Sequence, residues 1–365
     1  MYDIKESMMF SIIYSQLEGE RYKTPTIPHD ILFFLFNYSQ KKNINIYRIN
    51  IEERGKFLQE VFKIFSEKYP RKKIDKRKES LERLFLDEGR IGELFTIVDK
   101  EIKICNENNI KIIPFNSNKY PEKLKKLEDP PFTIFIKGKL PSDKELEKSL
   151  AIIGSRKIEP NYSEKVAKKV AETLFDNGWW NISGLARGID TYGHVGSLNR
   201  GGLTGAILGY GLNQKIYPAE NEKLAHEILR KDGFLMSEIP PSTKKEDIFL
   251  TQRNRLQSGL TNGIFVVATS TRGGTLHTIK YSVNQNDKVT FIWHPSSVEE
   301  YHQIDELKGN HSLIEIRDKT LFPTAKFTRE EFKKIHPIKN AKELNEILKT
   351  HKKVENHKHI QKTIF

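Results

Sequence analysis

Two short apolar segments of this chain each run directly into a glycine-containing turn that carries an arginine. Residues 150–153 precede the first turn and residues 180–182 the second. The first turn is Gly154-Ser155-Arg156, and the second contains Ser183, Gly184, Arg187 and Gly188. A strand followed by such a turn and a helix exposes backbone N–H groups that bind phosphate oxygens, and a guanidinium adds a bidentate contact. The two turns therefore predict an anion site on one edge of a sheet.

The middle of the chain alternates short β-branched apolar runs with amphipathic stretches, which indicates a mostly parallel sheet with crossover helices. We expect strands at 110–114, 132–136, 150–153, 180–182, 203–208, 234–236, 264–267 and 289–293. We expect helices between them at 163–175, 189–198, 221–230, 252–260 and 275–283. The predicted fold class is α/β, with a Rossmann-like, mostly parallel sheet and helices on both of its faces.

The length of 365 residues is too great for one ordinary hydrophobic core. Residues 1–109 are predicted to form a mainly helical N-terminal domain, and residues 110–318 the sheet domain. Residues 319–365 are polar and basic, with one helix expected at 341–348. The basic run 68–78 is interpreted as a solvated linker, and an arm that touches DNA is the alternative.

The chain is strongly basic, with 61 Lys and Arg against 48 Asp and Glu and a formal net charge of +13. This charge favours an acidic partner, nucleic acid more than anionic lipid, because the longest apolar run (31–36) is too short to span a bilayer. Cys105 is the single cysteine, which excludes an intramolecular disulfide and a cysteine-cluster metal site. We expect a soluble cytoplasmic protein with no membrane segment, no metal and no cofactor.

Polar motifs follow five of the predicted strands, where open α/β sheets bind their ligands. They are Arg156, Arg187, Gly209-Tyr210-Gly211, Ser237-Glu238, and Arg272 with Gly273, Gly274 and Thr275. The pattern predicts that these groups share one edge of the sheet.

A basic and aromatic segment lies between the fourth and fifth of these motifs. It contains Lys244, Lys245, Phe249, Arg253 and Arg255. Cations and a ring this close together could hold a single strand through its phosphates and a base face. The alternatives are that Phe249 fills the core and that one of the two arginines is structural, because positions i and i+2 of a helix do not share a face.

Asp190 and His194 are four residues apart on a predicted helix. They could form an acid–base pair, but no nucleophile accompanies them. A hydrogen bond that holds a loop in place is the favoured interpretation.

The middle of the chain resembles the DNA-processing protein A (DprA, also called Smf) family over roughly residues 105–317. The matching residues are Tyr120-Pro121, Leu124, Asp129-Pro130-Pro131, Lys137-Gly138, Gly154-Ser155-Arg156, Ser183 through Asp190, His194, Gly201-Gly202, Thr204, Gly211-Leu212, Tyr217-Pro218, Asn221, Leu224, Ser237-Glu238, Pro240, Phe249, Arg253-Asn254-Arg255, Leu260, Gly274-Thr275, Gly309-Asn310 and Leu313-Ile314. Many family members also end in a winged-helix module, and residues 319–365 show no clear sign of one.

This resemblance implies an extended Rossmann domain that binds single-stranded DNA, forms a homodimer and hands the strand to a RecA-type recombinase during natural transformation or recombination. It implies no catalysis. The family's strand-binding positions correspond to Arg156, Arg187 and the segment from Lys245 to Phe249.

Two other functions remain open at this stage. The first is a nucleotide-binding sensor of the same superfamily, with a possible place in phage defence, since a phosphate-binding edge would serve either ligand. Enzymes resembling cytokinin-activating phosphoribohydrolases need a glutamate after a glycine loop, and the loop at Gly273-Gly274 lacks it. The second is an adapter that docks an acidic protein.

Overall fold

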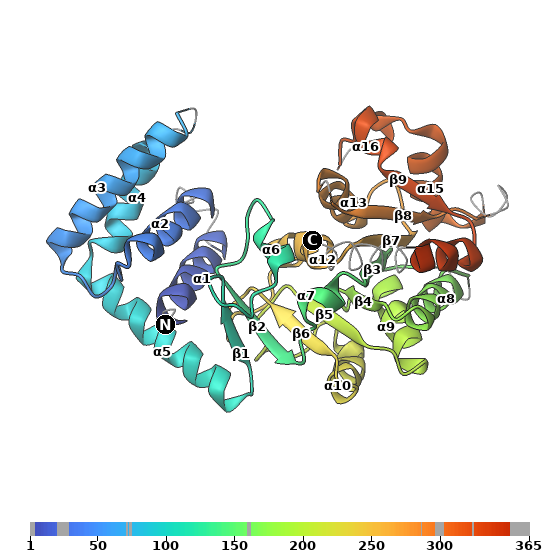
Figure 1. Ribbon diagram of the computed structural model, residues 1–365, viewed down its shortest axis with the longest axis horizontal. Helices are drawn as coiled ribbons and strands as arrows, with labels where there is room; N and C mark the ends of the chain where they lie inside the picture. Colours follow the sequence, from blue (N-terminus) through green and yellow to red (C-terminus); the bar gives the residue numbers. More distant parts are fainter. Residues whose placement is uncertain are drawn as a thin grey trace, which may run out of the picture.

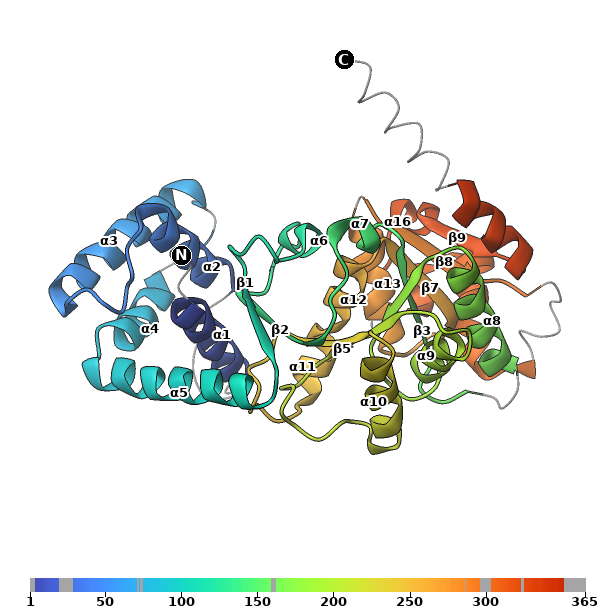
Figure 2. The same ribbon diagram turned by 60° about the horizontal axis from the view of Figure 1, so that its bottom comes forward.

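The computed structural model describes residues 4–19, 29–70, 72, 75–158, 162–285, 287–295, 303–322 and 325–350. The molecule is elongated, with helices α1 to α5 grouped at one end and a sheet extending from them to the other end (Figures 1 and 2). The first helices are α1 (Ile4–Gly19), α2 (His29–Lys42), α3 (Ile51–Lys68), α4 (Asp75–Phe85) and α5 (Glu88–Glu107). The helical character expected for residues 1–109 is therefore present.

Within the described residues the sheet has nine strands, in the order β1-β2-β6-β5-β4-β3-β7-β8-β9. The strands are β1 (Lys111–Pro114), β2 (Thr133–Gly138), β3 (Ser149–Gly154), β4 (Trp180–Ser183), β5 (Thr204–Leu208), β6 (Phe234–Ser237), β7 (Gly263–Ala268), β8 (Val289–Trp293) and β9 (Ile335–Ile338). Only the pairs β1·β2 and β2·β6 are antiparallel. The predicted fold class, a mostly parallel α/β sheet, is confirmed.

The remaining helices connect and cover the strands. They are α6 (Glu122–Lys125), α7 (Asp143–Leu146), α8 (Tyr162–Asp176), α9 (Ile189–Asn199), α10 (Glu222–Arg230), α11 (Asp247–Gln252), α12 (Asn254–Leu260), α13 (Thr275–Asn284), α15 (Lys308–His311) and α16 (Arg329–Lys333). Single 3-10 turns include η1 (Ala219–Asn221) and η2 (Asp305–Leu307).

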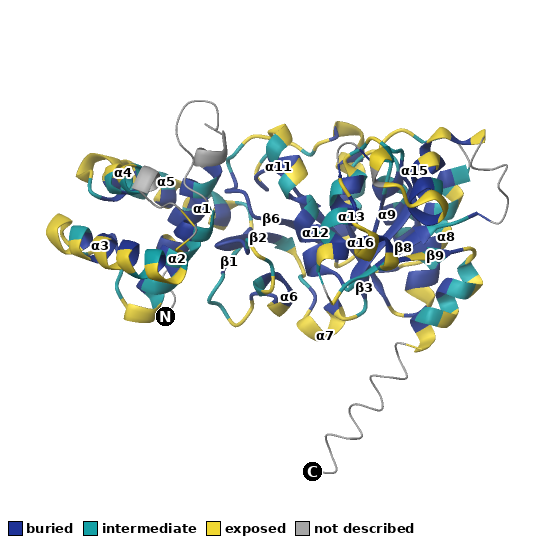
Figure 3. Cartoon of the chain, turned by 90° about the horizontal axis from the view of Figure 1, so that it is seen from above, coloured by how far each residue is buried: buried dark blue, intermediate teal, exposed yellow. Residues whose placement is uncertain are grey.

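Alternating side chains of β3 supply both faces of the sheet with apolar surface. Leu150 and Ile152 belong to a buried cluster with α8, whereas Ala151 and Ile153 belong to another with α13. Because helices cover both faces, the central strands are buried along their whole length, as Figure 3 shows in dark blue. This arrangement leaves the turns that follow the central strands as the accessible part of that edge of the sheet.

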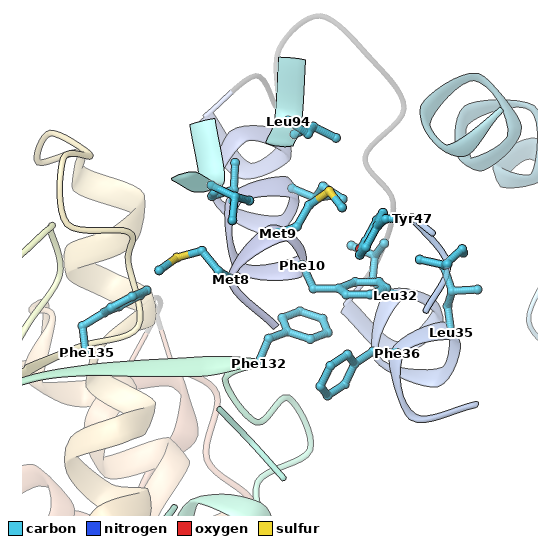
Figure 4. Packing of buried hydrophobic residues seen from close by; sticks show 14 of the residues in the cluster. Met8, Met9, Phe10, Leu32, Leu35, Phe36, Tyr47, Leu94, Phe132 and Phe135 are labelled. Atoms are coloured by element: carbon cyan, nitrogen blue, oxygen red, sulfur yellow. The ribbon is translucent and has the colours of Figure 1, made fainter. Parts of the chain in front are cut away.

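The N-terminal helices pack directly against the sheet. The ring of Phe10 on α1 stacks on Phe132 beside β2, with centroids 5.5 Å apart, and also contacts Phe36 on α2 (Figure 4). Ser7 donates a hydrogen bond of 2.6 Å to the carbonyl of Phe132. A shared aromatic core therefore joins these helices to the first antiparallel strands. Helix α4 begins inside the basic run 68–78, of which residues 71, 73 and 74 lie outside the described residues.

The polar region after residue 318 differs from the expected one, because it adds a strand to the sheet. β9 pairs in parallel with β8, and Thr290 is the register partner of Ile335. Phe327 and Phe332 are buried in the cluster that α13 covers. The pattern Ile-His-Pro-Ile is short and contains a proline, which a strand tolerates at a sheet edge. The expected helix is present at 341–350, and residues 351–365 lie outside the described residues.

Candidate nucleic-acid interface

The two glycine-containing turns lie against each other at the carboxyl edge of the sheet. The first follows β3, and the second joins β4 to α9. The amide of Ile189 donates a hydrogen bond of 3.3 Å to the carbonyl of Ser155. Gly188 has a φ of +74°, and a Cβ placed on it would lie 2.3 Å from that same carbonyl oxygen. Glycine is therefore needed here both for its backbone conformation and for the close approach of the two turns.

Asp190 holds the second turn in place. Its buried carboxylate accepts hydrogen bonds from the amides of Gly184 (3.0 Å) and Ala186 (3.5 Å). Burial raises the pKa of Asp190, and the positive charge of Arg253 opposes that shift. His194 is fully buried and bonds Thr204 through Nδ1 at 2.7 Å. Burial lowers the pKa of His194 to about 3, so its imidazole is neutral. The hydrogen bonds of Asp190 agree with the favoured interpretation, in which this part of the helix holds a loop in place.

Two adjoining clefts open where these turns meet. The larger, of about 650 Å³, lies between the first turn and the start of α13 and includes Gly154, Ser155, Arg156, Gly273, Gly274 and Thr275. The smaller, of about 190 Å³, includes Arg156, Gly184, Arg187 and Tyr217. Arg156, Lys157, Ala186 and Arg253 line both clefts. The structure thus brings the arginines of the two turns to one side of the fold, as the spacing of the motifs predicts.

Arg253 is the most unusual group in these clefts. It is only 4% exposed, and its Nε and Nη1 atoms have no hydrogen-bond partner among the described residues. Burial lowers its pKa from the ordinary value, and Asp190 counteracts that effect. A Cβ on Gly184 would lie 1.3 Å from Nη1, so the absence of a side chain at that position makes room for the guanidinium. Because unsatisfied buried donors are costly, this side chain is suited to an acceptor that enters the clefts.

Three exposed cations surround the buried one. Arg156 and Lys157 are exposed at the first turn, and Arg187 is exposed at the second. Arg187 donates to both carboxylate oxygens of Glu220, with Nη2 at 3.1 Å from Oε2, which raises the pKa of Arg187 and lowers that of Glu220. Since both side chains of this pair are exposed to solvent, an incoming phosphate can compete with Glu220 for the guanidinium.

Arg255 does not lie in the clefts, although the sequence predicts it as a strand-binding residue. It lines neither cleft, and its buried guanidinium pairs with Glu238 and with Asp129, each at 2.7 Å. The prediction that Arg255 binds the strand is corrected, because the carboxylates of Glu238 and Asp129 already engage its guanidinium. The alternative interpretation, that one arginine of the pair is structural, describes Arg255.

The prediction that the ring of Phe249 contacts a base is also corrected. Its side chain is only 2% exposed, because the first turn of α11 directs it inward, so its ring offers no face to a base. Lys244 and Lys245 just before it are exposed. Lys245 places Nζ 4.6 Å from the ring centroid of Tyr217, a residue of the smaller cleft. The basic segment therefore approaches the rim of that cleft through Lys245 and not through its phenylalanine.

Sequence reasoning missed Tyr217 and Lys157 as cleft residues. Tyr217 is 40% exposed, and its backbone N–H donates to the hydroxyl of Tyr210 at 2.8 Å. The available signal was an aromatic residue before a proline and soon after the turn at 209–211. Lys157 directly follows Arg156, and a second cation at the same turn was visible in the sequence.

Two further observations bear on the chemistry of the described part of the chain. It contains no group of three or more His, Cys, Asp or Glu side chains that could hold a metal ion. None of its helices combines the length and the apolar character needed to cross a membrane.

Comparison with known proteins finds related sequences. The family model described as DNA recombination-mediator protein A matches residues 111–333. Protein Smf of Borreliella burgdorferi is 34% identical over 188 residues, which cover 52% of this chain and 59% of that protein. DNA processing protein DprA of Bacillus subtilis is 33% identical over 201 residues, 55% of this chain and 66% of that protein. The matched region thus spans less than two thirds of each of these relatives.

Solved structures share the fold. The X-ray structure of DNA processing protein A from Streptococcus pneumoniae matches with a TM-score of 0.62 and 20% identity, covering 92% of this chain and 96% of that one. The DNA processing protein A of Helicobacter pylori, whose structure is described for its single-stranded DNA binding mode, matches with a TM-score of 0.52 and 22% identity. That match covers 66% of this chain and 96% of the other.

Proposed function

Because the chain belongs to the DNA recombination-mediator protein A family, we propose that it binds single-stranded DNA at the two clefts and hands the strand to a RecA-type recombinase. One observation carries the proposal: exposed Arg156 and Arg187 converge with buried Arg253 on adjoining clefts at the carboxyl edge of the sheet. We further propose that it works in the cytoplasm as a homodimer in natural transformation or recombination, as members of the family are expected to do.

The arrangement of the cations suits a sugar-phosphate chain better than a single anion. Exposed Arg156, Lys157 and Arg187 offer separate contacts to successive phosphates. Exposed Lys244 and Lys245 extend the positive surface beyond the smaller cleft. A net charge of +13 adds long-range attraction for a polyanion.

Two features of the region around the clefts favour binding of the strand over cleavage of its bonds. The imidazole of His194 is neutral, bonded to Thr204 and out of contact with solvent, so it does not act as an acid or base in the clefts. The loop at Gly273-Gly274 is followed by His277 and Thr278 where a hydrolase of this superfamily would need its glutamate. We therefore propose a mediator without catalytic activity, which acts by holding the strand.

The experiment compares single- and double-stranded DNA of equal length by fluorescence anisotropy across a salt series. We expect tighter binding of the single strand, and a log–log salt slope of about −0.7 for each phosphate that a cation neutralises. Arg187→Ala should weaken binding and flatten the slope by about that amount, and the freed Glu220 carboxylate would add repulsion.

Arg200→Ala is the matched control for that variant. Arg200 is also an exposed arginine paired with a carboxylate, Asp176 at 2.9 Å, and it lines neither cleft. Equal losses in the two variants would mean that net charge alone governs binding. Unchanged binding of Arg187→Ala and Arg156→Ala would refute the proposed site.

A nucleotide sensor is the second candidate, and the composition of the larger cleft favours it. Asp305 and Glu306 on η2 line this cleft together with the glycines at the start of α13. Carboxylates disfavour a polyanion but accept hydrogen bonds from the hydroxyls of a ribose. Titration with mononucleotides decides between the candidates: saturable binding to the larger cleft, with no binding of oligonucleotides, would favour the sensor.

A further inference from the structure

A third cleft, of about 340 Å³, lies beside α12, on which both α6 and α13 pack (Figure 1). None of its described lining residues lines either cleft of the candidate interface. Lys288, which directly precedes β8, lines it, so the cleft extends toward the amino edge of the sheet, away from the two glycine-containing turns. Sites for small molecules enclose about 300–1,000 Å³. The third cleft is therefore large enough for a small ligand, and strand binding gives it no role.

Arg255 is the most buried cation of this cleft, with 2% of its side chain exposed. Its Nε and Nη2 atoms donate to Asp129 and Glu238, but Nη1 has no hydrogen-bond partner among the described residues. A buried donor that lacks an acceptor is costly. Arg255 thus holds one guanidinium nitrogen ready for an acceptor that enters the third cleft.

Lys288 supplies a second cation to the cleft. Its Nζ donates to the backbone carbonyls of Gly259 at 3.1 Å and Thr261 at 2.6 Å, which leaves one of the three ammonium protons for another acceptor. Burial lowers the pKa of Lys288 to about 8, and the positive charge of Lys123 lowers it further. An anion beside Lys288 would offset both effects, because it stabilises the charged ammonium.

The remaining charges of the cleft limit how acidic its ligand can be. Lys126 pairs with Asp287 at 3.3 Å, and since both side chains are exposed, an incoming anion can compete for the ammonium. Glu128 and Asp129 also line the cleft. Three carboxylates repel a polyanion such as a DNA backbone, whereas one or two acidic groups can be balanced by the lysines and Arg255.

We propose that the third cleft binds a small organic anion, with one acidic group at Lys126 and Lys288 and a second acceptor at Nη1 of Arg255. The acidic group is a carboxylate or a phosphate, since an ammonium donates to either. This site lies outside the proposed function and does not depend on strand binding.

The test measures the melting temperature of the full chain against succinate and against phosphoglycolate at constant ionic strength, because a ligand that binds only the folded chain raises it. The chain carries Arg156→Ala and Arg187→Ala throughout, which weakens the clefts of the candidate interface as competing anion sites. We expect a saturable rise with at least one of the two probes. Butyrate has the length of succinate but lacks its second carboxylate, so it should bind about tenfold more weakly.

Two variants test the residues of the site. Lys126→Ala should weaken binding of succinate or phosphoglycolate by up to about fivefold. Lys125→Ala is the matched control, because Lys125 also lies on α6 and pairs with a carboxylate, Glu122 at 2.6 Å, but does not line the cleft. Arg255→Lys keeps a cation for the two buried carboxylates and removes Nη1, so it should weaken succinate about tenfold and leave butyrate unchanged.

Each outcome supports or overturns the proposal. A rise with only one probe supports it and identifies the acidic group as a carboxylate or a phosphate. No rise with either probe overturns it, and so do equal effects of Lys126→Ala and Lys125→Ala. If Arg255→Lys does not fold, the comparison of succinate with butyrate and the two lysine variants still decide. In the otherwise wild-type chain, weaker binding of oligothymidylate to Lys126→Ala than to Lys125→Ala would mean that this cleft holds DNA, which also overturns the proposal.

Discussion

Gly184→Ala is the substitution that probes the site most sharply, because it adds a single methyl group where the buried guanidinium lies. The new Cβ would lie 1.3 Å from Nη1 of Arg253, so the two groups cannot coexist. Nη1 is the far end of a flexible side chain, and the guanidinium can swing away without displacing the backbone. We therefore expect the free energy of unfolding to fall by only about 1 kcal/mol, the low end of the cost of overpacking.

The effect on binding should be larger than the effect on stability. Displacement of Arg253 would remove its proposed charge-assisted hydrogen bond to the bound strand, and such a bond contributes about 1.5–3 kcal/mol to the free energy of binding. That loss corresponds to a rise in Kd for oligothymidylate of about tenfold to a hundredfold. Fluorescence anisotropy measures this change, and urea unfolding measures stability. Gly92→Ala is the control, since a Cβ at Gly92 on α5 meets no atom within 4 Å.

A double-mutant cycle provides the decisive comparison. If Gly184→Ala acts through the guanidinium, the double variant with Arg253→Met should bind no more weakly than Arg253→Met alone. Additive losses in the double variant would contradict the reasoning, because Gly184 would then affect binding by another route. Wild-type affinity in Gly184→Ala would contradict it as well.

Three further predictions concern residues around the site. The buried carboxylate of Glu101 on α5 accepts hydrogen bonds from the backbone amide (3.0 Å) and the hydroxyl of Ser242. Ser242 lies just before the exposed Lys244 and Lys245, so Glu101→Gln should loosen the loop that carries these lysines. We expect severalfold weaker binding of oligothymidylate, measured by fluorescence anisotropy. Phe249→Leu should cost up to about 1.5 kcal/mol in urea unfolding and leave the Kd unchanged, and a lower affinity at equal salt would restore Phe249 as a contact. The pKa of His194 is lowered from 6.5 to about 3, so between these values the unfolded chain binds the proton and the folded chain does not. The stability that the neutral, buried His194 contributes is thus lost as pH falls below 6.5. Between pH 7 and pH 5 the free energy of unfolding should fall on the order of 2 kcal/mol more in the wild-type protein than in His194→Gln. Equal losses in the two proteins would contradict the lowered pKa of His194.

Local patterns predicted the elements that depend on neighbouring residues. The turns at Gly154 and Gly184 could be recognised because an apolar run, a glycine and a helical pattern follow one another within a few residues. Their meeting at one edge followed from parallel strand direction, which brings carboxyl ends together. The strand β9 was missed because four residues with a proline carry little periodic signal, and its pairing with β8 is a tertiary contact.

The candidate site was predictable only in part, because burial is decided by distant segments. Phe249 and Arg255 have residue types that suit a nucleic-acid contact, but α11 turns the ring inward and two carboxylates hold the guanidinium. The burial of Arg253 depends on the missing side chain of Gly184, which is far from it in sequence. The backbone of Tyr217 is likewise held by a tertiary contact, its two hydrogen bonds to the hydroxyl of Tyr210.

The central claim is that a single strand lies across the two turns at the carboxyl edge of the sheet. Amide hydrogen exchange with and without oligothymidylate tests it most directly, because it reports which backbone amides the ligand protects. We predict that protection on binding concentrates in residues 154–157, 184–188 and 273–275. Protection confined to α1–α5 or to α10, with these turns exchanging as fast as in the free protein, would contradict the claim.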